Sequence, residues 1–244
     1  MTLLVAVVVG IVVGRVAGRI GRRLPEAAAV RRIALALVCA VAIAGALVPA
    51  LLVVDAGHLE VRPLSGADDP RLGLFLLAMH GGQLGAVFCA RELGEDLGTT
   101  PTRRGYGLAV LVAVSAIGVS ALWSLLLTAL GADFGNQVIV DAITGAPRIG
   151  LVLAVVVVAP ILEELLFRGW VLPRLMRRFG DGPGFTITAL GFAALHLDAP
   201  QVAPPILALA LALGWLRLRT GSVWPGVVAH MLNNGIALLL SSSI

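Results

Sequence analysis

The chain has 244 residues, of which 59% are hydrophobic and 13% are charged, and its mean hydropathy is +0.99. A soluble domain of this size has too small an interior to bury so much apolar surface, so the composition excludes a soluble globular protein and predicts a polytopic membrane protein. The net charge of +4 comes from 18 basic residues, all arginine, and it needs no nucleic-acid partner because arginines that flank membrane spans account for it.

Apolar runs of about 20 residues predict eight membrane-spanning helices in an all-α integral membrane protein. They lie near residues 2–18, 33–54, 72–90, 107–131, 149–170, 184–199, 204–218 and 222–241. Arginines follow the first run instead of preceding it, so we expect an uncleaved span and not a signal peptide. The loops between spans are short, which predicts a single membrane domain over residues 1–244.

Arginine-rich loops alternate with arginine-poor loops along the whole chain. The positive-inside rule therefore places the arginine-rich loops in the cytoplasm and both termini outside. The Ala, Val, Gly and Arg usage suggests a GC-rich bacterial genome, so we expect a multi-pass protein of the bacterial inner membrane, with the lipid bilayer as its surroundings. Cys39 and Cys89 lie in apolar stretches and predict no disulfide framework.

The fifth span, within "VVVVAPILEELLFRGW", contains two glutamates and an arginine. Charged residues within a membrane span are costly and indicate a functional site. Glu164 and Arg168 are four residues apart and share a helix face, which predicts an ion pair. Glu163 is turned by about 100° from that face. We therefore expect one glutamate to be held by the arginine and Glu163 to be available for chemistry.

Histidines and an asparagine add to this group from two later spans. His196 lies in "GFAALHLDAP", and His230 lies in "GVVAHMLNNGIALLL" with Asn234 one turn later on the same face. A single histidine in a membrane span is commonly a helix-packing residue. Two of them beside Glu163 favour a catalytic group. His80, next to two glycines and Gln83, fits close helix packing better than catalysis.

These residues could hydrolyse an amide in two ways. In one, Glu163, with His196, deprotonates a water, while His230 and Asn234 donate hydrogen bonds to the oxyanion. In the other, a zinc ion bound by Glu163, His196 and His230 lowers the pKa of the water. The residues alone do not choose between them. The H-E-x-x-H zinc motif is absent from the sequence, because no histidine is followed by glutamate.

Three ordered motifs resemble those of a known family: Glu163-Glu164-x-x-x-Arg168, Phe192-x-x-x-His196 and His230-x-x-x-Asn234. The resemblance is to the CPBP family, which includes CAAX prenyl endopeptidases of the Rce1 type, their bacterial homologues and bacteriocin-immunity proteins. It implies an intramembrane protease whose catalytic core spans residues 149–241, after variable N-terminal helices over residues 1–148.

The resemblance assigns water activation to Glu163 and His196, oxyanion stabilisation to His230 and Asn234, and a supporting role to Glu164 and Arg168. It implies a membrane protein or lipid-associated peptide as the substrate. Because bacteria generally lack protein prenylation, cleavage beside an isoprenylated cysteine is not expected. Family names imply a metalloprotease, whereas a metal-free glutamate mechanism is also favoured, so zinc stays open.

Two features leave alternatives. Counted from the expected cytoplasmic ends, Glu163 and His230 lie about two turns deep and His196 about three, so the sixth span either begins later than Gly184 or tilts. Buried Glu, His and Arg residues also form proton relays, which leaves a proton-coupled transporter as an alternative function. A non-catalytic membrane scaffold with the family fold is the third possibility.

Overall fold

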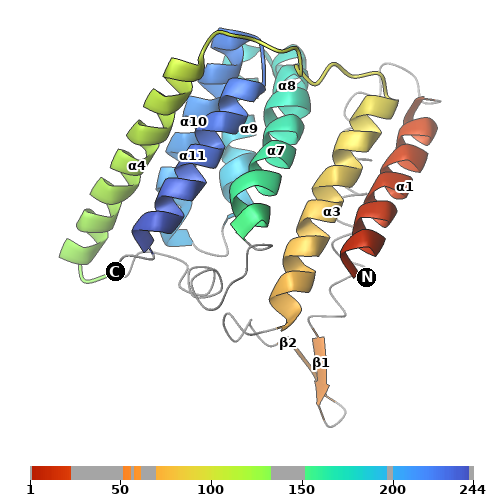
Figure 1. Ribbon diagram of the computed structural model, residues 1–244, viewed down its shortest axis with the longest axis horizontal. Helices are drawn as coiled ribbons and strands as arrows, with labels where there is room; N and C mark the ends of the chain where they lie inside the picture. Colours follow the sequence, from red (N-terminus) through yellow and green to blue (C-terminus); the bar gives the residue numbers. More distant parts are fainter. Residues whose placement is uncertain are drawn as a thin grey trace. The chain divides into compact units, whose positions relative to one another are not determined.

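The computed structural model describes residues 2–22, 52–55, 58–61, 70–132, 152–196 and 200–241 (Figure 1). The chain divides into two compact units. Unit 1 comprises Met1–Asp96 and Asp141–Ala154, and unit 2 comprises Leu97–Val140 and Val155–Ile244. The regular secondary structure of the described residues is helical apart from one short hairpin. Each unit is described below by itself.

Unit 1 is built on a pair of helices, α1 (Thr2–Arg22) and α3 (Pro70–Glu92), that pack against each other. Gly14 and Gly18 of α1 lie directly against the backbone of α3, so that a Cβ at Gly18 would lie 2.9 Å from the carbonyl oxygen of Cys89. Small residues spaced by four allow this close approach of two membrane helices. Glu92 accepts from Arg22 at 3.0 Å and pairs with Arg15 at 3.5 Å.

A two-stranded antiparallel hairpin, β1 (Leu52–Asp55) and β2 (His58–Val61), also belongs to unit 1. It corrects two expectations. The predicted second span, 33–54, cannot remain helical to its end, and the segment predicted as a loop after it contains a strand. The rest of that span and Cys39 lie outside the described residues. β-Branched valines in both strands favour this conformation.

Unit 2 is a bundle of helices that includes the last four predicted spans (Figure 1). Its elements are α4 (Tyr106–Ala129), the continuous helical segment η3 (Ala154–Val158), α7 (Ala159–Glu164), η4 (Leu165–Val171) and α8 (Leu172–Phe179), then α9 (Asp181–Ala194), the short η5 (Pro200–Val202), α10 (Ala203–Thr220) and α11 (Trp224–Ser241). Helix α4 packs on α10 and α11, α9 on α8 and α10, and α11 on α7.

Two prolines explain the π-helical segments η3 and η4. A proline ring clashes with the carbonyl four residues earlier and lacks an N–H donor. Pro160 follows η3 and Pro173 follows η4, so each widened turn includes the carbonyl that the ring would meet. Widening to the i→i+5 pattern relieves the clash without ending the helix. The segment therefore carries Glu163, Glu164 and Arg168 on one continuous support.

The predicted spans correspond to helices of the structure, but several of their predicted end residues differ from the observed ones. The fifth span continues to Phe179 and the sixth begins at Asp181, before Gly184 and not after it. Gly180 separates them because it adopts a positive φ of 89°. Glu163 and His196 consequently lie about four turns from Gly180, one before it and one after it, which removes the expected difference in their depth. The division of the chain at residues 148/149 stays a prediction.

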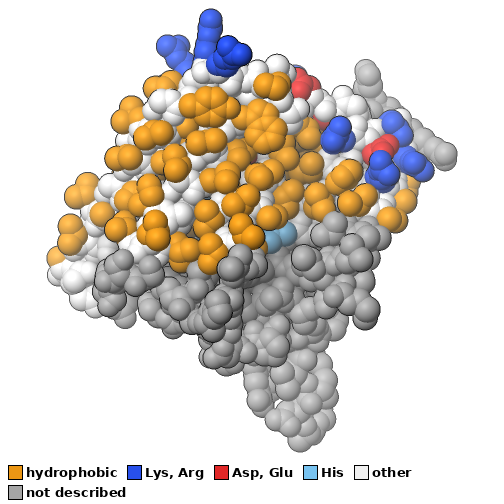
Figure 2. All heavy atoms as spheres, in the orientation of Figure 1, with side chains coloured by type: hydrophobic (Ala, Val, Ile, Leu, Met, Phe, Trp, Pro, Cys, Tyr) orange, Lys and Arg blue, Asp and Glu red, His pale blue; other side chains and the backbone are white. Residues whose placement is uncertain are grey.

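The face of unit 2 that Figure 2 shows is mostly apolar, with arginines at one end. Helix α4 is the one described helix that is both long and apolar enough to cross a membrane, and most of its residues are exposed. Its buried side is a row of small residues, Ala109, Val112 and Ala116, which packs on Leu213 of α10 and Ala229 of α11. That the other predicted spans cross a membrane stays a prediction.

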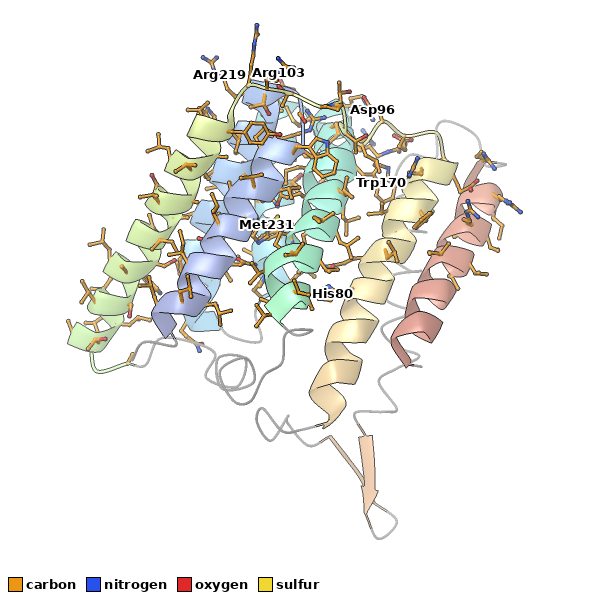
Figure 3. The ribbon with its side chains drawn as sticks, in the orientation of Figure 1. His80, Asp96, Arg103, Trp170, Arg219 and Met231 are labelled. Atoms are coloured by element: carbon orange, nitrogen blue, oxygen red, sulfur yellow. The ribbon has the colours of Figure 1, made fainter. Side chains whose placement is uncertain are left out.

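The arginine-rich loops of unit 2 meet at the same end of the bundle, where Arg103 and Arg219 are labelled in Figure 3. This arrangement agrees with the alternation of arginine-rich and arginine-poor loops; that this end is cytoplasmic stays a prediction. A segment before α4 crosses the turn between α10 and α11. Val223 N donates to Gly98 O at 3.0 Å and Ser222 Oγ donates to Thr100 O at 2.8 Å, which fixes the start of α11.

Candidate active site

Arg168 and Glu164 form the buried ion pair that their spacing predicts. Arg168 Nη1 donates to Glu164 Oε1 at 2.7 Å, and the two side chains are 1% and 0% exposed. Arg168 Nη2 donates to the carbonyl of Ala210 on α10 at 3.0 Å. The guanidinium also lies 4.5 Å from the ring centroid of Phe192 on α9. Arg168 thus ties the glutamate-bearing helix to two neighbouring helices.

His230 of α11 lies beside both glutamates. Its Nδ1 is 3.3 Å from Glu164 Oε1, and its Nε2 is 3.8 Å from Glu163 Oε2. Glu163 is 7% exposed and His230 is 4% exposed, so the group is shielded from solvent. His230 therefore contacts the two glutamates through opposite ring nitrogens, and the availability of Glu163 for chemistry stays a prediction.

The hydrogen-bond partners determine which nitrogen of His230 carries a proton. Glu164 Oε1 accepts a hydrogen bond from Arg168, and we take the same oxygen as the acceptor in its contact with His230. A contact between this carboxylate and Nδ1 is a hydrogen bond only if Nδ1 is the donor. We therefore assign a proton to Nδ1 of His230, which leaves Nε2 as the nitrogen nearer to Glu163.

His196 lies just after α9, in a turn whose backbone N–H donates to Ala193 O at 3.0 Å. Its Nδ1 is 3.1 Å from the carbonyl oxygen of Phe192, which can only accept, so Nδ1 carries the proton and Nε2 the lone pair of the neutral ring. The rings of His196 and His230 lie 5.2 and 5.9 Å from the ring of Phe192. Phe192 is therefore the common packing partner of both histidines.

Asn234 lies one turn beyond His230 and holds the helix of the glutamates. Its Nδ2 donates to Val155 O at 3.0 Å, and its Oδ1 accepts from Asn233 Nδ2 at 3.3 Å. In the i→i+5 pattern of η3, the carbonyl of Val155 would pair with the N–H of residue 160, which is proline and has none. Asn234 supplies the missing donor with one amide hydrogen and keeps its second one.

A zinc site was the alternative role of Glu163, His196 and His230. Among the residues that the structure describes, no three His, Cys, Asp or Glu side chains are grouped so that they could bind one metal ion. A catalytic zinc takes three protein ligands. The chemistry below is written through water and the protein's own side chains.

His80 belongs to unit 1. It is buried in α3, where its Nδ1 lies 3.2 Å from Oε1 of Gln83, one turn later. That His80 serves helix packing stays a prediction.

Three contributors were not assigned from the sequence. Phe192 was recognised only as a motif position, although its spacing of four from His196 is a signal for a shared face. Asn233 was overlooked beside Asn234. The carbonyl of Ala210 leaves no signal in the sequence, because any residue type provides it.

Residues 144–236 match the family model described as type II CAAX prenyl endopeptidase Rce1-like. This part of the chain is similar to Rce1-like domains. The family is a membrane-embedded protease family, and the match contains all three motifs that carry the resemblance. No curated protein and no solved structure matches the chain.

Proposed function

We propose that this protein is an intramembrane endopeptidase that hydrolyses a peptide bond of a membrane-associated protein or peptide. The observation that carries the proposal is the position of His230 against Glu163 and Glu164, buried within the segment that matches an endopeptidase family. Peptide hydrolysis needs a base for water and donors for an oxyanion. Carboxylate, imidazole and amide groups of these kinds are gathered in unit 2.

In the proposed reaction, Glu163 takes one proton of an attacking water, while the lone pair on Nε2 of His196 accepts a hydrogen bond from the same water and helps to orient it. The water oxygen bonds to the scissile carbonyl carbon, and the negative charge develops on the carbonyl oxygen. His230 and the second amide hydrogen of Asn234 donate to that oxygen. The proton held by Glu163 then passes to the leaving nitrogen as the carbon–nitrogen bond breaks.

His230 needs a proton on both ring nitrogens for this role, one for Glu164 and one for the oxyanion.

The setting of the reaction is part of the proposal. We place eight helices in a bacterial inner membrane, with both termini outside and the arginine-rich end of unit 2 in the cytoplasm. The exposed apolar surface of α4 supports a lipid environment. The substrate is a membrane protein or lipid-associated peptide, and neither nucleic acid nor an oligomeric state enters the proposal.

The test compares the protein termini of membrane fractions by mass spectrometry in native cells. The strains carry the wild type, a deletion, Glu163→Gln or Asp96→Asn at matched expression. Glu163→Gln keeps the size of the side chain and removes the carboxylate. Asp96→Asn makes the same chemical change at an exposed residue outside the proposed catalytic group. A protease predicts that specific termini vanish in the deletion and in Glu163→Gln but persist with Asp96→Asn.

The rival functions give different results. A scaffold predicts that Glu163→Gln behaves as the wild type while the deletion changes the cells. A proton-coupled transporter predicts no lost termini in any strain, and it also predicts little effect of Asn234→Ala, because an amide does not relay protons. Either pattern would refute the protease.

A further inference from the structure

Gly226 lies on α11 one turn before His230, on the same face of the helix. A Cβ at this position would lie 2.9 Å from Oε2 of Glu164, closer than carbon and oxygen atoms pack without a shift. The absence of a side chain at residue 226 therefore sets how closely the Glu164 carboxylate approaches α11.

The Glu164 carboxylate is held unequally at its two oxygens. Oε1 accepts from Arg168 at 2.7 Å and contacts Nδ1 of His230 at 3.3 Å. Oε2 is buried against Gly226 and has no hydrogen-bond partner among the described residues. The room left by the missing side chain of Gly226, and not a hydrogen bond, therefore sets the position of Oε2.

We propose that Gly226 is a positioning residue that fixes the protonation site of His230 through Glu164. The bare Cα lets the carboxylate reach Nδ1 of His230, which keeps the proton on Nδ1 and leaves Nε2 beside Glu163 for the reaction. This inference rests on the proposed function and deepens it, because it names what determines the state of the imidazole. Gly226 touches no reacting atom and acts only through Glu164.

The geometry makes this contact sensitive to a small displacement. A separation of 3.3 Å between Nδ1 and Oε1 is already near the long end of hydrogen-bond distances. A methyl group at residue 226 would push Oε2 away, and Oε1 would move with it while Arg168 stays bound. His230 would then lose the acceptor that holds Nδ1–H, and a neutral form with its proton on Nε2 alone would become populated.

The atom that a methyl group would meet is the end of a flexible side chain, so we expect the Gly226→Ala protein to fold. Gly235→Ala is the matched control on the same helix. A Cβ there would lie 3.6 Å from Cγ1 of Val156, an ordinary contact, so this substitution leaves the Glu164 carboxylate in place.

The experiment is solid-state NMR of protein labelled with ¹⁵N-histidine and reconstituted in lipid bilayers. The His230 signals are those that disappear in His230→Gln. We expect wild type and Gly235→Ala to show His230 with a proton on Nδ1, whether or not Nε2 is also protonated. Gly226→Ala should show a neutral Nε2–H form that neither of them shows. Cleavage at the sites whose termini vanish in Glu163→Gln should fall about 10–100-fold in Gly226→Ala and stay unchanged in Gly235→Ala. Changes in groups that orient the side chains of a site have effects of this size.

Two results would overturn the proposal. One is a wild-type His230 whose Nδ1 is unprotonated, a measurement that needs no variant to fold. The other is a folded Gly226→Ala protein whose His230 signals match those of the wild type. Both readouts are independent of any substrate, so failure of the protease proposal in cells leaves the NMR result intact and the two failures can be told apart.

Discussion

Removal of the Arg168 side chain should destabilise the protein strongly. The guanidinium bonds Glu164 and the Ala210 carbonyl and lies over the ring of Phe192, and it is 1% exposed. In Arg168→Ala, the Glu164 carboxylate would stay buried without its cation, and the Ala210 carbonyl would lose a donor. The damage therefore comes mainly from the groups left behind.

The size of the effect follows from the burial of the pair. Breaking a buried ion pair by removing one partner costs about 3–5 kcal/mol, because the other charge stays uncompensated. At roughly 2–4 °C per kcal/mol for a chain of this length, the melting temperature should fall by about 6–20 °C. Replacing both partners, as in Glu164→Gln with Arg168→Met, should recover part of this loss since no buried charge then lacks a counter-charge.

The assay is thermal unfolding of purified protein in detergent, together with the folded yield from matched cultures. Arg103→Ala is the control, because Arg103 is exposed and its loss should change the free energy of unfolding by no more than about 0.5 kcal/mol. If the Arg168→Ala protein has the same melting temperature as the Arg103→Ala protein but no longer cleaves, Arg168 acts in catalysis or substrate binding, and the structural explanation is wrong.

Two further substitutions test the support of the site. Asn234→Ala should lower the free energy of unfolding by about 1–3 kcal/mol, because the Val155 carbonyl loses its hydrogen-bond donor. The measurement is thermal unfolding, and an unchanged melting temperature would contradict that role. Gly169→Ala should lower the folded yield, since its Cβ would lie 2.6 Å from the backbone oxygen of Leu97, whereas Gly118→Ala meets nothing within 4 Å. Gly118→Ala should be neutral or stabilise α4 by up to about 1 kcal/mol, and equal effects of the two glycine substitutions would refute the packing explanation.

The helical character and the ion pair could be predicted because each depends on residues close together in the chain. Apolar run length predicted helices in all seven of the expected spans that lie mainly within the described residues. The spacing of four predicted the contact between Glu164 and Arg168, since one turn of helix brings those side chains together wherever the helix lies. The spacing of Gly14 and Gly18 is also a local signal of a close helix–helix contact, which the structure places between α1 and α3.

Boundaries and long-range partners could not be predicted in the same way. The fifth span was expected to end at residue 170, yet Pro173 does not end it because the backbone widens into η4 and continues to Phe179. That choice depends on packing around the helix and not on local preference. The hairpin of unit 1 was missed because strand pairing joins residues whose partnership no local pattern specifies.

The sequence by itself determined which chemical groups this protein brings into an apolar environment and which of them share a helix face. Only the tertiary structure decided that His230 meets both glutamates through opposite ring nitrogens and that Asn234 serves the carbonyl left by Pro160. It also decided that Gly226 makes room for Glu164. The reason is physical: helix geometry relates neighbours in the chain, whereas the contacts between helices depend on side-chain volumes and backbone shape along their whole length.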